Sequence, residues 1–238
     1  MAKIIDGLSV FLPVYNEESN LQKVILKTKD VLIRVAENWE LTIVNDGSTD
    51  STLSVAEELV KGDGRIRIVN HEKNKGYGAA LSSGFYGSKY PWIAFTDSDG
   101  QFDFNEIVNF IEMQKNTNAD LVIGYYKSRK VSFSKVVTSK LWELLVFMFF
   151  GLKVRDVDCA FKLISKEVIN KIDRLESERG AFISSELLIK AKKAGFSIVE
   201  IPVTHYPRTK GEGTGRNLNV IIKSFTDLFK LWKKLKTG

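Results

Sequence analysis

Short apolar runs alternate with longer segments of helical periodicity along most of this chain. The apolar runs predict buried strands near residues 8–14, 40–45, 66–70, 92–96, 120–124 and 197–203. The periodic segments predict helices near residues 18–36, 51–61, 78–88, 104–117, 136–150, 166–172, 182–194 and 217–235. This alternation predicts an α/β fold in which a mostly parallel sheet is flanked by helices.

Polar residues follow the predicted strands, and right-handed crossovers bring the carboxyl ends of such strands to one edge of the sheet. In open α/β sheets, that edge binds ligands. The fourth strand delivers Asp97 and Asp99, two carboxylates spaced i, i+2, with Gln101 close behind. Hard oxygen donors suit Mg²⁺ or Mn²⁺ that retains water and bridges the phosphates of a substrate. Asp and Gly also form ordinary turns, so the metal hypothesis depends on the segments upstream.

Three segments before this acidic motif have the same order of strand, polar turn and helix. Residues 8–18 end a buried strand at Pro13, residues 41–51 run from a β-branched strand into a turn, and residues 66–80 contain a glycine-permitted loop. All three segments place polar residues at the edge that also receives Asp97. Their presence favours a ligand site over a simple turn.

Taken together, these motifs resemble those of the family 2 glycosyltransferases, which have the GT-A (Rossmann-like) fold. The resemblance is closest to the dolichyl-phosphate mannose or glucose synthases and to bacterial polyprenyl-phosphate glycosyltransferases, and it covers nearly the whole chain. The matching segments are residues 13–18, 44–50, 74–78, 97–101, 156–163 and 200–203, together with Arg208.

The resemblance implies a donor that is a nucleotide-diphosphate sugar, either a UDP- or a GDP-hexose. Asp46 is suited to bind the nucleobase, because a carboxylate accepts an imide or amide N–H. Asp46 is also a turn-former before Gly47, and the two roles are compatible. We expect Asp97 to reach the ribose or the metal, and Asp99 with Gln101 to hold Mg²⁺ or Mn²⁺. The donor-binding residues that the resemblance implies are Pro13, Tyr15, Asn16, Glu17, Asp46, Lys75, Gly76, Asp97 and Ser98.

The implied reaction is a single displacement with inversion at the sugar. A cation at Asp97 and Asp99 neutralises charge on the leaving diphosphate and acts as the Lewis acid for its departure. Asp97, Asp99 and Glu186 are therefore the catalytic candidates. Glu186 lies on the helix predicted over 182–194, where it is either a base or a buried structural partner of Arg208.

Two basic loops on the acceptor side, at residues 127–135 and 208–216, are suited to bind phosphate. Guanidinium groups and glycine-exposed amides bind phosphate oxygens. The resemblance implies polyprenyl or dolichyl phosphate as the acceptor, and a phosphate monoester with a second pKa of about 6 needs no strong base. Solvated surface charge is the alternative for both loops, and a lid that closes over the donor diphosphate is a further alternative for the glycine-rich loop that begins at Arg208. The candidate acceptor residues are Lys127, Arg129, Lys135, Arg208 and Lys210.

Three other functions compete with this hypothesis. A dinucleotide-dependent oxidoreductase needs a Gly-x-Gly-x-x-Gly turn after the first strand, which residues 13–17 do not provide. A noncatalytic nucleotide- or membrane-binding module would not need the acidic motif. Within the enzyme class, the alternative is transfer to a saccharide or protein hydroxyl, which requires a carboxylate base such as Asp156, Asp158 or Glu186.

Length and composition favour a single glycosyltransferase domain over residues 1–238. A chain of 238 residues can bury a sizeable core, and no Pro/Ser-rich linker or internal repeat interrupts it. We expect residues 1–125 to bind the nucleotide sugar and residues 126–238 to form the acceptor half. The single cysteine, Cys159, excludes an intramolecular disulfide, and its apolar context favours an inert core thiol.

The carboxyl-terminal helix predicted over 217–235 combines an apolar stripe with crowded lysines, as expected for a helix that lies on anionic lipid. A solvated lysine face on an ordinary packed helix is the alternative. Residues 141–152 hold one charge, Glu143, but are too short to span a bilayer, and a buried helix is favoured there over an interfacial one. With no visible signal peptide and a lone cysteine that fits a reducing compartment, we expect a cytoplasmic protein, peripheral on the cytoplasmic membrane face, without a nucleic-acid partner.

Overall fold

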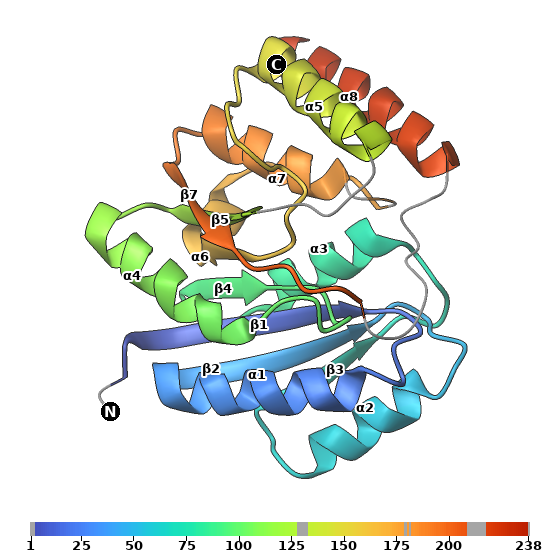
Figure 1. Cartoon of the computed structure of the whole chain (residues 1–238), viewed down its shortest axis with the longest axis vertical. Coiled ribbons are helices and arrows are strands. Elements are labelled where there is room, and N and C mark those ends of the chain that lie inside the picture. The colour runs from blue at the N-terminus through green and yellow to red at the C-terminus, as the bar shows by residue number, and fades with distance from the viewer. Residues whose placement is uncertain (1–2, 128–132, 179, 181, 209–217, 238) are drawn as a thin grey trace.

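The computed structural model describes residues 3–127, 133–178, 180, 182–208 and 218–237 (Figure 1). The described strands form a seven-stranded sheet with the order β3-β2-β1-β4-β6-β5-β7. The pairs β1–β2, β2–β3, β1–β4 and β5–β7 are parallel, whereas β6 runs antiparallel to both β4 and β5. The strands are β1 (Ile5–Val14), β2 (Ala36–Asn45), β3 (Ile66–Asn70), β4 (Trp92–Phe95), β5 (Leu121–Tyr126), β6 (Lys162–Ser165) and β7 (Ile198–Val203).

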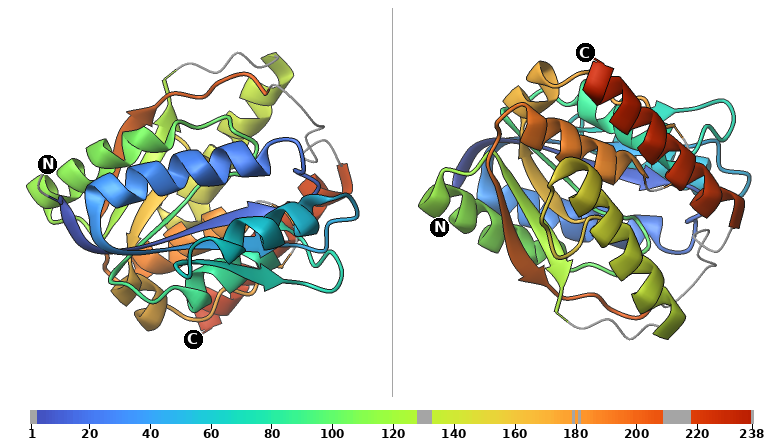
Figure 2. Two further views of the ribbon diagram at one scale, coloured as in Figure 1. Left: turned by 90° about the horizontal axis from the view of Figure 1, so that it is seen from below. Right: turned by 90° about the horizontal axis from the view of Figure 1, so that it is seen from above.

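Helices cover both faces of the sheet (Figure 1). Because β1 is buried on both faces, its side chains supply two cores: Leu8, Val10 and Leu12 pack with α1, α2 and α4, and Phe11 packs with α3 and the helices beyond it. The helices α5 and α8 lie side by side outside α7 (Figures 1 and 2). The helices are α1 (Leu21–Val35), α2 (Thr52–Lys61), α3 (Tyr77–Gly87), the short 3₁₀ helix η1 (Phe104–Glu106), α4 (Ile107–Thr117), α5 (Phe133–Phe150), α6 (Lys166–Lys171), α7 (Phe182–Lys193) and α8 (Leu218–Thr237).

The predicted α/β architecture is confirmed, with two differences. The prediction lacked β6, the antiparallel strand, because β6 has only four residues and begins with a charged one, Lys162. The prediction also placed the second strand at 40–45, whereas β2 begins at Ala36, directly after α1 ends at Val35. Ala36 is buried between these elements, so the chain passes from helix to strand without a polar turn that a sequence pattern could reveal.

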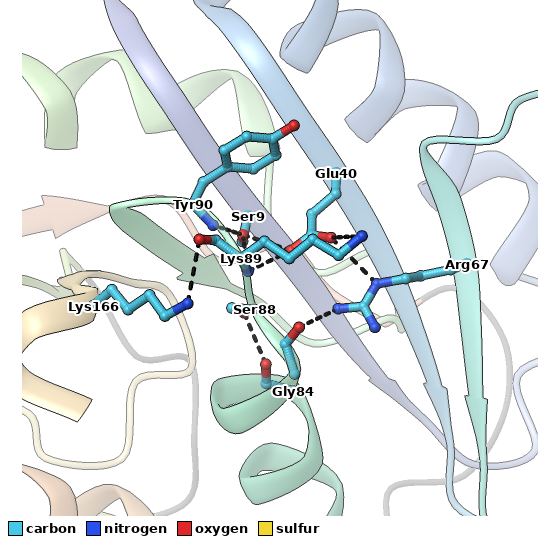
Figure 3. A network of polar contacts seen from close by, with 9 residues as sticks. Ser9, Glu40, Arg67, Gly84, Ser88, Lys89, Tyr90 and Lys166 are labelled. Atoms are coloured by element: carbon cyan, nitrogen blue, oxygen red, sulfur yellow. Dashed lines mark hydrogen bonds and ion pairs between the residues drawn. The ribbon is translucent and has the colours of Figure 1, made fainter. Parts of the chain in front are cut away.

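A buried polar network fixes the entrance to β4, the strand that carries the acidic motif (Figure 3). The Glu40 carboxylate on β2 accepts hydrogen bonds from the Ser9 hydroxyl on β1 and from the Lys89 backbone N–H, both at 2.7 Å. The Tyr90 N–H donates to the Ser9 hydroxyl at 2.9 Å, and Arg67 on β3 places its Nε 3.3 Å from Glu40. The network therefore ties three strands to the connection that leads into β4.

Candidate functional site

The parallel strands bring the predicted site residues to one edge of the sheet. Loops leave that edge after β1, β2, β3, β4, β5 and β7, and they carry residues 13–17, 46–50, 71–76, 97–101, 127 and 204–208 respectively. The antiparallel β6 enters the sheet at the same edge, because Lys162 pairs with Phe95 at the end of β4. The sequence-based expectation that these segments converge is confirmed.

Asp97 and Asp99 stand directly beyond β4, and Tyr77 holds the first of them. The Tyr77 hydroxyl, on the first residue of α3, donates to Asp97 Oδ1 at 2.9 Å. Burial, with the neighbouring charge of Asp99, raises the pKa of Asp97 to about 6, against the lowering effects of the Tyr77 hydrogen bond and of Lys162. Because the two carboxylates repel each other, a cation bound between them would stabilise both in their ionised form.

Arg208, in the segment after β7, places a positive side chain beside these carboxylates. Its guanidinium forms an ion pair with Glu17 Oε1, and its Nη1 lies 3.6 Å from Asp99 Oδ2. Glu17 is buried, and its second oxygen accepts a hydrogen bond from Asn20 Nδ2 at 2.7 Å. Burial raises the pKa of Glu17, while Asn20 and Arg208 oppose that rise. Arg208 thus links the loop after β1 to the loop after β4.

The acidic loop is fastened to the segment that carries Arg208. The Gln101 N–H donates to Asp99 Oδ1 at 3.0 Å, and the Gln101 side-chain amide donates to the Tyr206 carbonyl oxygen at 2.8 Å. The Tyr206 N–H returns a hydrogen bond to the Gln101 carbonyl oxygen at 2.8 Å, beside a bridge between Phe102 and His205. Since the amide nitrogen of Gln101 donates to Tyr206, its side-chain oxygen is the Gln101 side-chain atom that a cation would bind.

The donor set at this loop fits a divalent cation that keeps part of its water shell. Within the described residues, no group of three or more His, Cys, Asp or Glu side chains is arranged to hold a metal ion. Mg²⁺ and Mn²⁺ nevertheless bind through one or two carboxylates when substrate phosphates and water complete the shell. Asp97, Asp99 and Gln101 match that requirement in donor type, and burial beside Asp99 makes the ionised form of Asp97 costly unless a further positive charge binds.

Asp46, at the end of β2, shapes the loop that precedes α3. Its carboxylate accepts backbone hydrogen bonds from Lys75 at 2.9 Å and from Gly76 at 2.8 Å, and a third contact from His71 Nδ1 at 2.7 Å. Gly76 has φ of 105°, a conformation that favours glycine. His71 also contacts Ser83 Oγ at 2.9 Å. His71 was missing from the predicted site residues, although its place just after β3 was a usable signal.

Hydrogen bonds between the first two loops hold the remaining donor candidates. Asn16, with φ of 55°, accepts a hydrogen bond from the Thr49 N–H at 2.8 Å, and the Glu17 N–H donates to Thr52 Oγ1 at 2.8 Å. The buried Ser98 hydroxyl donates to the Pro13 carbonyl oxygen at 2.8 Å. Tyr15 lies half-buried between these contacts, in the loop after β1. The side chains of Asn16 and Ser98 are therefore part of the loop scaffold.

The acceptor candidates divide between described and undescribed parts of the chain. Lys127 is exposed directly after β5, at the same sheet edge as Arg208. Arg129 and Lys210 lie outside the described residues, and Lys135 lies on α5 at a position whose side chain is outside them. The acceptor prediction can therefore be placed in the structure only at Lys127 and Arg208.

Glu186 lies elsewhere in the fold from Arg208. It is fully buried on α7, where it forms an ion pair with Lys190 at 2.6 Å. The alternative that Glu186 is the structural partner of Arg208 is wrong, because Arg208 pairs with Glu17 and Asp99 at the sheet edge. Spacing alone could not reveal this, since Lys190 is one helical turn from Glu186 and Glu17 is 191 positions from Arg208.

Lys162, the first residue of β6, and Cys159, shortly before it, are buried near the acidic pair. Lys162 is fully buried, and its ammonium donates to the carbonyl oxygens of Val157, at 3.3 Å, and Cys159. Burial lowers the pKa of Lys162 and raises that of the Cys159 thiol to about 12. The predicted burial of Cys159 is confirmed. Lys162 was not predicted as a countercharge to Asp97, since charged residues are rarely buried within a strand.

Known proteins resemble the chain in both sequence and structure. A family model described as glycosyl transferase family 2 matches residues 9–173. The chain belongs to glycosyl transferase family 2. This glycosyltransferase is 29% identical to the dodecaprenyl-phosphate galacturonate synthase of Rhizobium johnstonii, over 97% of this chain and 69% of that protein. It is 30% identical to a dolichyl-phosphate beta-glucosyltransferase of Trichomonas vaginalis, over 94% of this chain and 72% of that protein.

The solved structures that resemble this glycosyltransferase confirm the GT-A fold. Glucosyl-3-phosphoglycerate synthase from Mycobacterium tuberculosis, in complex with Mn²⁺ and UDP-glucose, superimposes with a TM-score of 0.68. The match covers 94% of this chain and 77% of that chain at 20% identity, which establishes the fold. Among the described residues of the family 2 enzyme, no helix has the length and apolar character needed to cross a membrane.

Proposed function

We propose that this glycosyltransferase moves a hexose from a UDP- or GDP-sugar to a polyprenyl or dolichyl phosphate, with inversion at the sugar. The observation that carries the proposal is the acidic pair, Asp97 and Asp99, at the carboxyl edge of the sheet, with Arg208 beside it. The names of two similar relatives, a dodecaprenyl-phosphate galacturonate synthase and a dolichyl-phosphate beta-glucosyltransferase, support the same acceptor class.

In this proposal, Asp97, Asp99 and Gln101 hold Mg²⁺ or Mn²⁺, which supplies the Lewis acid for departure of the nucleoside diphosphate when it is bound. Tyr77 orients Asp97 through its hydroxyl, so that the carboxylate keeps one direction. Gln101 fixes Asp99 through its backbone N–H. These hydrogen bonds support a preorganised site, which is the main source of electrostatic catalysis in such reactions.

The donor pocket that we propose runs from the loop after β1 to the start of α3. Asp46 already accepts two backbone N–H groups and contacts a histidine, and a carboxylate has about four acceptor positions, so one further N–H from a nucleobase can be accommodated. The pocket would be lined by Pro13, Tyr15, Asn16, Glu17, Asp46, Lys75, Gly76, Asp97 and Ser98.

A phosphate acceptor removes the need for a strong base, because its oxygen is already anionic at neutral pH. Lys127 and Arg208 are the described cations that we assign to it, since both lie at the carboxyl edge of the sheet. The second candidate function, transfer to a saccharide or protein hydroxyl, needs a carboxylate free to take a proton. Glu186 is a poor base in this structure, because it is 1% exposed on α7 and forms an ion pair with Lys190 at 2.6 Å.

Peripheral association with the cytoplasmic membrane face is part of the proposal, and the exposed apolar side chains of α5 and α8 support it. Among the described residues, Leu141, Leu144, Phe147 and Met148 on α5 and Phe229 on α8 are each about half exposed. Lys230, Lys233, Lys234 and Lys236 on α8 add charge that would attract anionic lipid. The prediction that the helix at 141–152 is buried is wrong for one side of α5, which is exposed. It is confirmed for the other side, where Trp142 and Val146 are buried.

A panel of UDP- and GDP-sugars, each with a short polyprenyl phosphate and Mn²⁺, tests the proposal by mass spectrometry. We expect a sugar–phosphoprenyl product from one nucleobase class, and we expect Arg208→Ala to raise the KM for polyprenyl phosphate or to lower kcat sharply. Arg65→Ala is the matched control, because Arg65 also pairs with a carboxylate, Asp63, but lies directly before β3 begins, at the opposite edge of the sheet. Transfer only to a free saccharide, abolished by Glu186→Gln, would replace the proposal with the second candidate function.

A further inference from the structure

A buried ion pair on α7, between Glu186 and Lys190, lies outside the site described above and hydrogen-bonds to the backbone of a neighbouring segment. Glu186 and Lys190 are 1% and 4% exposed, and burial of two charges is costly unless each is fully paired. Their partners belong to residues 174–178, which we call the strap. The Glu186 carboxylate accepts the Glu176 and Ser177 N–H groups at 2.9 Å each, and Lys190 donates to the Arg174 carbonyl oxygen at 2.7 Å.

The strap in turn contacts α3, the helix that begins with Tyr77. The Ala79 N–H, in the first turn of α3, donates to the Glu178 carbonyl oxygen at 2.9 Å. Gly78 is in such close contact with the strap that a Cβ atom there would overlap the Ser177 carbonyl oxygen. At the other end of α3, the Tyr86 hydroxyl accepts the N–H of Leu175 at 2.9 Å. The strap therefore fixes α3 at both ends.

We propose that Glu186 is a positioning residue: with Lys190 it holds the strap, and the strap holds the first turn of α3 so that the Tyr77 hydroxyl stays on Asp97. The inference rests on the proposed function, because it gives Asp97 the role of binding the donor and its cation. In this role, Glu186 would affect the reaction without contacting the substrate. Glu186 is 1% exposed and both of its oxygens accept strap N–H groups, so it presents no exposed oxygen that could take a proton from a substrate.

The first test does not depend on activity. Amide hydrogen exchange in Glu186→Gln should be about tenfold or more faster at Ala79 and at the strap, because a glutamine amide group cannot accept both N–H groups. Amides of β1 should not change. Glu167→Gln is the matched control, since Glu167 forms the same i, i+4 pair with a lysine on α6 but is exposed. Unchanged exchange at Ala79 would overturn the proposal, whether or not the enzyme transfers sugar to a lipid phosphate.

The second test is a double-mutant cycle with Tyr77→Phe, read as donor KM against kcat. If both residues act through the orientation of Asp97, each single variant should raise the donor KM about tenfold, and the double variant should add less than about twofold to the larger effect. Multiplicative effects would overturn the proposal, and so would a kcat loss of about a hundredfold in Glu186→Gln that Tyr77→Phe does not share, which indicates a base. If Glu186→Gln fails to fold, Glu186→Gln with Lys190→Met removes the unpaired buried charge and takes its place in both tests.

Discussion

Asp99→Asn separates the cation-binding role of the acidic motif from its role in the fold. The substitution removes one negative charge and keeps the shape of the side chain, and the new amide oxygen can still accept the Gln101 N–H that Asp99 accepts at 3.0 Å. Loss of a main charge-stabilising group lowers turnover by about two orders of magnitude or more, equivalent to about 2.7 kcal/mol of transition-state stabilisation. We therefore expect at least this loss in sugar transfer.

The stability cost of the same substitution is small. Arg208 lies 3.6 Å from Asp99, both side chains are partly exposed, and Arg208 keeps its ion pair with the buried Glu17. An ion pair of this kind contributes up to about 1 kcal/mol, after screening by water. For a protein of this size, that corresponds to a fall in Tm of about 2–4 °C. The activity loss should therefore be far larger than the stability loss.

Initial rates over a Mn²⁺ titration, together with thermal unfolding, measure both effects. Asp103→Asn is the matched control, because Asp103 lies in the same loop but accepts the N–H of Asn105 at the start of η1. Full activity of the parent enzyme in EDTA, or an unaffected Asp99→Asn, would refute the cation role. A fall in Tm of more than about 10 °C would instead assign Asp99 to the fold.

Three further predictions concern stability and the membrane. Arg65 holds the pKa of Asp63 well below its usual range, so the stability that Asp63 contributes is complete above its unfolded pKa of about 4 and is lost as pH falls from there toward the lower folded pKa. Asp63→Asn should remove this part of the acid-induced loss of stability, measured by denaturant unfolding from about pH 7 to about pH 2. Glu40→Gln should lower the free energy of unfolding by about 1–3 kcal/mol, because it weakens a buried network, and the same denaturant unfolding measures it. Leu144→Ser should weaken binding to anionic vesicles in a sedimentation assay, whereas Leu26→Ser, at a similarly exposed position on α1, should not.

The sheet edge and its acidic motif could be predicted because each depends on local order in the sequence. Apolar strands that end in polar turns place those turns at one edge of a parallel sheet, and Asp97 and Asp99 follow such a strand. The same logic located the loops after β1, β2 and β3. It could not locate β6, whose four residues begin with the buried Lys162, because no local pattern announces a charged residue inside a sheet.

The pairing of charges could not be predicted, because it depends on where distant segments meet. Glu186 was considered as a partner of Arg208, yet the partner of Glu186 is Lys190, one turn along its own helix. Tyr77 belongs to a motif that the sequence analysis recognised, but its hydrogen bond to Asp97 requires the third and fourth loops to meet. Such contacts depend on tertiary geometry, and the sequence pattern constrains only the edge at which they occur.

The position of Arg208 between two carboxylates has a consequence for cation binding. A lone arginine on Asp99 would have to give up its partner when a divalent cation binds there, and an unpaired charge in a partly buried site is costly. Glu17 removes that cost, because Arg208 keeps an ion pair with Glu17 whichever cation Asp99 faces. Glu17 in turn stays paired, since Asn20 also donates to it. The arrangement therefore lets Asp99 exchange its partner without leaving a buried charge alone.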